Sequence, residues 1–148
     1  MRKTVTLLER AKVDAMLVRM SIDQATEDDL FLDAAAYHLQ QSIEKAIKYT
    51  FEINGCQYPL VHNIYELWEF SEANNIPLPQ WVYDNADTLN SYATRTRYGK
   101  NVIGTKRKIE ELLKIVTEYI EALAPEHTNT PLTPASVFSS KPKGGHQI

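Results

Sequence analysis

The feature that most limits the folds open to this chain is a helical hydrophobic period that no strand pattern interrupts. Apolar residues recur every three or four positions in five segments, at residues 4–20, 27–53, 61–74, 79–94 and 104–123. No run alternates β-branched or aromatic residues with polar ones, and Asn54-Gly55 follows a helical stretch instead of joining two strands. The connections between the segments are short. The sequence therefore predicts an all-α fold, an antiparallel up-and-down bundle of about five helices.

Local signals place the ends of these helices. Ser21-Ile22-Asp23 is expected to interrupt the first helix, and Thr26 or Asp28 to begin the second by accepting free backbone N–H groups. Asn54-Gly55 is a left-handed stop signal, and Pro79 suits the first turn of the fourth helix. These signals delimit a bundle over residues 1–124.

Length and composition narrow the class of protein. A chain of 148 residues is the size of one domain, and residues 125–148 form a tail rich in Pro, Ser and Thr with few large apolar side chains. No apolar run is long enough to span a membrane, and the charged start of the chain does not develop into a signal peptide. Cys56 is the single cysteine, so no internal disulfide can form. We expect a soluble cytoplasmic protein.

The segment 27–53 separates into two faces when its residues are placed 100° apart. One is a broad apolar arc of Leu32, Ala35, Ala36, Leu39, Ile43, Ala46, Ile47 and Thr50. The opposite arc is polar and consists of His38, Gln41, Glu44, Lys45 and Lys48. Two interpretations stay open: a solvated helix face, or a polar seam against another helix, a second subunit or an anionic ligand.

A basic stretch follows the fourth segment. Although the net charge of the chain is −3, residues 95–108 carry six cations and no acidic residue, a local charge of +6. Arginine binds phosphate bidentately, and Tyr92 and Tyr98 are candidates to stack on a base. Three of the cations, at 106–108, begin the fifth helix, where positive charge is unfavourable unless an anion or a carboxylate lies among them. Arg95 and Arg97 are equally able to pair within the chain, with the carboxylates of Asp84, Asp87, Glu44 or Glu66.

Several kinds of catalytic site are missing from the sequence. There is no Gly-rich phosphate loop and no Gly-x-Ser-x-Gly elbow. The four histidines lack the spacing of a helical zinc pair, and Cys56 is expected to be a buried or loop residue, not a nucleophile. We therefore expect no metal site, no cofactor and no catalytic residue.

Three motifs, in this order, resemble the HEPN domain (higher eukaryotes and prokaryotes nucleotide-binding domain). They are Ala36-Tyr37-His38-Leu39-Gln40-Gln41-Ser42-Ile43-Glu44-Lys45-Ala46-Ile47-Lys48, then His62-Asn63-Ile64-Tyr65-Glu66-Leu67, then Tyr92 to Tyr98. The resemblance extends from Asp33 to Leu123. It implies a helical bundle that is usually a homodimer, and it brings two expectations: a nucleotide or RNA ligand, and a minimal nucleotidyltransferase as partner chain in a toxin–antitoxin pair. The positions that match the polar residues of the family are His38, Gln41, Glu44, Lys45, Lys48, Arg95, Arg97 and Tyr98.

One departure from the family bears on catalysis. Ribonuclease members carry Arg, four to six residues, and then His, but no His of this chain follows an Arg at that spacing. Gly99 also stands where the family commonly has Pro after Arg-Tyr, and the Gly-Ser and paired Asp of a nucleotidyltransferase are missing. The resemblance thus implies a non-catalytic domain.

Three hypotheses follow. The first is a domain that binds a nucleotide or RNA phosphate, as a homodimer, where the second and fourth helices face each other. The second is an interaction module without a ligand, which is favoured if carboxylates of the chain itself engage Arg97, Lys45 and His38. The third is a ribonuclease that uses a different base, His38 or His62.

Overall fold

The computed structural model describes residues 5–25, 30–97 and 105–124, and for residues 95–97 it describes only the backbone. These residues form six helices and no strand: α1 (Leu7–Gln24), α2 (Leu30–Ile53), α3 (Ile64–Ala73), α4 (Gln80–Asp84), α5 (Ala86–Arg97) and α6 (Lys106–Leu123). The prediction of an all-α bundle is confirmed. The expected start of the second helix at Thr26 or Asp28 and the tail at 125–148 lie outside the described residues.

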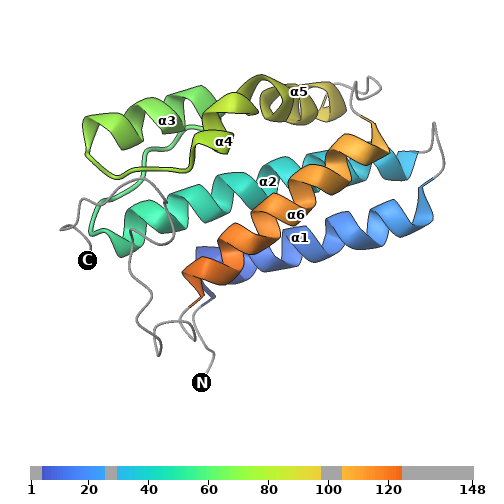
Figure 1. Cartoon of the computed structure of the whole chain (residues 1–148), viewed down its shortest axis with the longest axis horizontal. Coiled ribbons are helices and arrows are strands. Elements are labelled where there is room, and N and C mark those ends of the chain that lie inside the picture. Colours follow the sequence, from blue (N-terminus) through green and yellow to red (C-terminus); the bar gives the residue numbers. More distant parts are fainter. Residues whose placement is uncertain (1–4, 26–29, 98–104, 125–148) are drawn as a thin grey trace.

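Helix α2 is the centre of the bundle. It packs against α1, α3, α5 and α6, and α1 also contacts α6. Figure 1 shows α1 and α2 side by side, with α6 crossing them, while α3, α4 and α5 lie along the other side of α2. The eight residues of the apolar arc predicted on α2 are all buried, so this face meets the core. No described helix is long and apolar enough to cross a membrane.

Helix α1 differs from the prediction at both ends. It begins after Thr6, whose hydroxyl accepts from the Glu9 N–H (3.0 Å) while the Thr6 N–H donates to the Glu9 carboxylate (2.9 Å). This reciprocal capping box satisfies backbone groups that a helix start otherwise leaves free. The helix then continues through Ser21-Ile22-Asp23, so the predicted interruption there is wrong. Ile22 lies one turn after Val18 on the buried face and is itself buried, which holds the last turn in place.

The predicted fourth helix is two helices. Asn85 separates α4 from α5. Its side-chain amide bonds the carbonyl of Trp81 (2.8 Å), the same carbonyl that its backbone N–H bonds as in an ordinary helical turn (3.1 Å). A side chain that bonds a carbonyl four residues back competes with continuation of the helix. The predicted stop at Asn54-Gly55 is confirmed, since Gly55 has a φ of 76° and ends α2.

The stripe predicted on the last helix is confirmed residue by residue. Seven residues of α6 are buried: Ile109, Leu112, Leu113, Val116, Tyr119, Ile120 and Leu123. Tyr119 packs edge-on against Trp81 and shares a hydrogen bond with the Thr50 hydroxyl, so α6 is tied to α4 and to α2. The polar residues of α2 lie on the side of the helix opposite its apolar arc.

Candidate functional site: the polar seam of helix α2

The polar arc of α2 is not a solvated face. Glu44 and Lys48 are buried, with 5% and 6% of their surface exposed, and His38, Gln41 and Lys45 are half-buried. The pair Glu44–Lys48, one turn apart, forms an ion pair with 3.0 Å between Nζ and Oε2. The second interpretation, a polar seam, describes this arc: one part faces α1, and the other contacts the segment between α2 and α3.

The first half of the seam is organised by Asp14 of α1. Its two carboxylate oxygens bind different residues of α2: Oδ1 lies 3.0 Å from Nδ1 of His38, and Oδ2 accepts from the ammonium of Lys45. Asp14 is 7% exposed, whereas the side chains of His38 and Lys45 keep 29% and 28% of their surface exposed. A buried carboxylate is costly unless it is paired, and these two contacts pair it. Asp14 thereby attaches α1 to α2 at two points, one at each end of a two-turn span.

The second half of the seam is organised by Glu44. Oε1 accepts from the Gln40 amide (3.0 Å), and Oε2 lies 3.0 Å from the Lys48 ammonium and 2.7 Å from Nδ1 of His62. The Gln41 amide in turn donates to the Gln40 carbonyl (2.7 Å). Both carboxylate oxygens of Glu44 and the side-chain carbonyl of Gln40 therefore have partners, as buried polar groups require.

The segment after α2 covers this second cluster. The Tyr58 ring lies 5.3 Å from the Lys48 ammonium, in cation–π range. His62 precedes α3, and its ring is 75% exposed although Nδ1 touches the buried Glu44. A carboxylate accepts hydrogen bonds and donates none, so Nδ1 of His62 carries the proton and Nε2 faces away from the contact.

The lysines and the carboxylates of the seam are equal in number. Asp14 and Glu44 supply two negative charges, and Lys45 and Lys48 supply two positive charges. Each ammonium lies against a carboxylate within a hydrogen-bond distance. The seam is therefore an internal ion network that stabilises the packing of α1, α2 and the segment before α3, and both of its ammonium groups are already paired with carboxylates.

The remaining predicted site residues lie at the end of α5. Arg95 and Arg97 occupy its last turn, where only the backbone is described, and Tyr98 lies outside the described residues. The helices that were expected to face each other do so, since α5 packs on α2. One prediction is wrong: Tyr92 cannot stack on a base, because it is 1% exposed and part of the core. Burial raises the pKa of Tyr92 to about 12.

The cations that begin α6 are in a different situation. Thr105 caps the helix by accepting from the Lys108 N–H (3.1 Å), and no acidic residue lies in the first turn. Arg107 and Lys108 have side chains 89% and 41% exposed, and among the described residues each reaches one carboxylate, that of Glu111, at 3.9 and 4.0 Å. Contacts of this length between exposed groups contribute little to stability. These side chains remain accessible to an anion.

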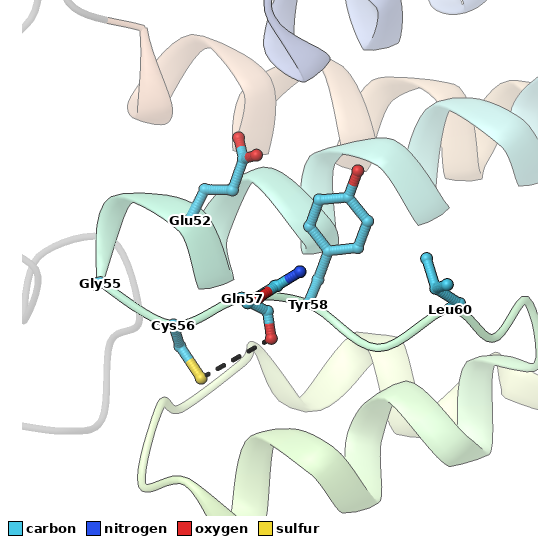
Figure 2. A pocket seen from close by; sticks show the side chains of 6 residues that line it. All are labelled: Glu52, Gly55, Cys56, Gln57, Tyr58 and Leu60. Carbon is cyan, nitrogen blue, oxygen red and sulfur yellow. Dashed lines mark hydrogen bonds between the residues drawn. The ribbon is translucent and has the colours of Figure 1, made fainter.

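A pocket of about 550 Å³ lies at the end of α2, apart from the residues that the motifs predicted (Figure 2). Its lining residues are Glu52, Gly55, Cys56, Gln57, Tyr58 and Leu60. Glu52 is the charged residue among them, so the pocket does not suit a phosphate. Cys56 lies in this loop and is partly buried, as expected. Among the described residues no group of three or more His, Cys, Asp or Glu side chains is placed to hold a metal ion.

The sequence prediction missed two residues that hold the seam together, Asp14 and Gln40. Asp14 had a signal: it stands between Ala11 and Val18 on the apolar face of its helix, where an acid is expected only with a partner. Gln40 had a similar signal, because it stands one turn after Ala36 and one turn before Ile43, at the edge of the apolar arc, and it is 1% exposed.

Comparison with protein families gives one match. The model of the HEPN domain matches residues 6–127, which includes all six helices. Comparisons with curated proteins and with solved structures give no match. The match covers far more than half of the chain and agrees with the helical architecture and with the resemblance in the motifs of α2, α3 and α5. This chain belongs to the HEPN domain family.

Proposed function

We propose that this HEPN-domain protein is a non-catalytic binding module that recognises the phosphate of a nucleotide or RNA, and that it acts as a homodimer. The observation that carries the proposal is the contrast in how its cations are held. Lys45 and Lys48 are matched by buried carboxylates, whereas the exposed cations at the start of α6 have no short ion pair to the described residues around them. The phosphate contacts are therefore assigned to the basic segment 95–108.

This assignment divides the eight residues that the motifs predicted. Arg95, Arg97 and Tyr98 belong to the basic segment and are proposed to contact the ligand, through bidentate arginine–phosphate bonds and stacking of a base on Tyr98. His38, Gln41, Glu44, Lys45 and Lys48 are proposed to support the site indirectly. Their contacts hold α1 and the segment before α3 against α2, the helix on which α5 packs.

The test is a binding titration with fluorescein-labelled single-stranded RNA and with labelled ATP. Arg97→Ala, and a variant with Lys106, Arg107 and Lys108 all replaced by Ala, are expected to bind more weakly. Arg10→Ala is the matched control, because Arg10 is an exposed cation of α1 that lies outside the basic segment. The absence of binding by the wild-type chain, or equal binding by wild type and Arg97→Ala, excludes the proposal.

A second candidate is an interaction module without a nucleotide ligand. Asp14 favours it, because this one carboxylate engages both His38 and Lys45, two of the three residues by which the hypotheses differ. The resemblance suggests a minimal nucleotidyltransferase as the partner chain, in a toxin–antitoxin pair. Co-expression with such a chain and measurement of a stable complex in the absence of RNA tests this candidate.

A ribonuclease with a different base is the third candidate, and the Glu44–His62 contact is the reason to test it. A carboxylate that holds Nδ1 of an exposed imidazole leaves Nε2 able to accept a proton, as a general base must. Incubation of tRNA and mRNA with concentrated protein decides the matter. Intact RNA excludes the activity, and cleavage that His62→Ala abolishes establishes it.

A further inference from the structure

Helix α1 is apolar on two sides. Its inner side buries Leu8, Ala11, Val18 and Ile22 against the bundle. Its outer side carries Val13, Met16 and Met20, which are 55%, 63% and 59% exposed. Their spacing of three and then four residues places them in one stripe. A contiguous stripe of large exposed apolar side chains on a helix surface marks a surface for association.

A groove of about 910 Å³ runs beside this stripe, between α1 and α6. Met16 and Ala15 of α1 line it together with Leu113 and Ile120 of α6, so its middle is apolar. Its edges are charged with opposite sign. The α1 edge carries Lys12 and Arg19, a charge of +2. The α6 edge carries Lys114 and the three acids Glu110, Glu118 and Glu121, a charge of +1 − 3 = −2.

The two helices run antiparallel along the groove. Arg19, near the end of α1, lies 3.9 Å from Glu110, near the start of α6. Lys12 lines the same groove as Glu118 and Glu121, which lie about two and three turns after Glu110 along α6. Figure 1 shows the same course, with the last turns of α6 beside the first turns of α1.

Twofold symmetry turns this charge pattern into a prediction about a second copy. An isologous contact joins the same surface of two molecules. If the twofold axis lies along the groove, α1 of each copy meets α6 of the other, and each basic edge faces an acidic edge. If the axis lies across the groove, α1 meets α1 and like charges face each other. The charges favour the first arrangement.

We propose that the α1/α6 groove is the surface through which two copies of this chain associate, with α1 of one copy over α6 of the other. This inference rests on the homodimer in the proposed function and adds the surface that forms it. A twofold rotation about an axis along the groove leaves the position of each residue along that axis unchanged. Arg19 therefore meets Glu110 of the second copy, Lys12 meets Glu118 and Glu121 of the second copy, and Met16 packs in the apolar middle.

The first experiment measures the mass of the full-length chain in solution by sedimentation equilibrium. The wild type is expected to be a dimer, and Met16→Glu to raise the dimer dissociation constant by roughly tenfold or more, because it puts a charge in the centre of the contact. Leu60→Glu is the matched control: Leu60 is 89% exposed in the segment between α2 and α3 and is expected to leave the dimer unchanged. A monomeric wild type, or a Met16→Glu dimer as tight as the wild type, overturns the proposal. Circular dichroism of both variants establishes that the bundle is folded.

The second experiment tests the charged edges with two double variants. Lys12→Glu with Arg19→Glu makes both edges acidic, and Glu118→Lys with Glu121→Lys makes both edges basic. Each variant alone is expected to dimerise more weakly than the wild type, since like charges then face each other. An equimolar mixture is expected to form a mixed dimer at least roughly tenfold tighter than either variant alone. If the acidic variant dimerises as well as the wild type, or the mixture gains nothing, the arrangement of α1 over α6 is wrong.

The labelled RNA titration of Met16→Glu separates this inference from the proposed ligand. A monomeric wild type that still binds RNA refutes the surface and keeps phosphate binding. A dimer that Met16→Glu dissociates, without RNA binding by either form, supports the surface and refutes phosphate binding.

Discussion

The polar seam of α2 and the first turn of α6 both carry cationic side chains, but those of the seam are paired with buried carboxylates and those of α6 are exposed. In the seam, Lys48 is buried with its ammonium 3.0 Å from Glu44. At the start of α6, Arg107 is almost fully exposed, and the carboxylate that it reaches in the described part of the chain, Glu111, is 3.9 Å away. A buried charge must be matched inside the protein, whereas an exposed charge is solvated and remains available to a ligand. The depth of a cation therefore decides whether it is neutralised inside the bundle or left exposed to solvent.

Glu44→Ala should have the largest effect on stability, because it removes the carboxylate that pairs with the buried Lys48. Lys48 would remain buried without its partner, which typically costs about 3–5 kcal/mol. The free energy of unfolding, from urea denaturation followed by circular dichroism, is expected to fall by that order. Glu111→Ala is the control, because Glu111 is the exposed partner of Arg107. It should change the free energy of unfolding by less than about 0.5 kcal/mol. Equal losses in the two variants would mean that the buried ion pair is no more important for stability than the exposed one.

Asp14→Ala should have the next largest effect. His38 and Lys45 keep access to water, so they are solvated when the carboxylate is lost, and we expect a loss of about 1–3 kcal/mol. A double-mutant cycle with Lys45→Met measures the coupling between α1 and α2. Additive losses would mean that the Asp14–Lys45 contact does not stabilise the fold.

Replacing Lys106, Arg107 and Lys108 by Ala should reduce the salt dependence of RNA binding. Each phosphate contact to a single strand contributes about 0.7 to the slope of log K against log salt, so three lost contacts lower the slope by about 2. Titrations at several salt concentrations measure it. Lys45→Ala, in the seam, is expected to leave the slope unchanged, and an equal change in both variants would place phosphate at the seam as well.

The smallest effect concerns Tyr92, which precedes the basic segment in sequence but lies in the core. Its hydroxyl is buried and has no hydrogen-bond partner among the described residues, so Tyr92→Phe should leave the fold as stable or up to about 1 kcal/mol more stable. Tyr119→Phe is the contrast, because it loses the bond to Thr50 and should cost about 1 kcal/mol. RNA affinity should be unchanged in Tyr92→Phe, and a marked loss would return Tyr92 to the ligand site.

The same tyrosine predicts how stability depends on pH. Burial raises the pKa of Tyr92 from an ordinary value near 10 to about 12. The neutral form is favoured in the fold, so its contribution is fully present below about pH 10 and is lost as the pH rises through about 12. Tyr92→Phe should therefore reduce the loss of stability between these pH values in urea denaturation. An identical alkaline transition in both proteins would mean that Tyr92 does not contribute to it.

Much of the fold was predictable because the buried face of an amphipathic helix appears in the sequence as apolar residues every three or four positions. The stripe of α6 and the apolar arc of α2 were predicted residue by residue, and both are buried as expected. Helix ends were less predictable. Ile22 is buried in the core, and α1 stays helical beyond the expected interruption. Helix α4 ends at Asn85, whose side chain bonds a backbone carbonyl, and the spacing of apolar residues gives no sign of such a bond.

The candidate site was predictable only in part. The motifs identified the residues of the polar seam, yet they did not supply its partners, because Asp14 precedes His38 by 24 residues and His62 follows Glu44 by 18. Such contacts depend on how α1 and the segment before α3 pack on α2. No local pattern encodes them.

The sequence by itself determined the all-α class, the central amphipathic helix, the basic segment 95–108 and the resemblance to the HEPN family. Each of these depends on the order and spacing of residues along the chain. Only the tertiary structure decided which cations are neutralised, that Tyr92 belongs to the core, and that an apolar groove with oppositely charged edges lies between α1 and α6. The reason is that desolvation and ion pairing depend on distances between helices, which are set when the bundle packs.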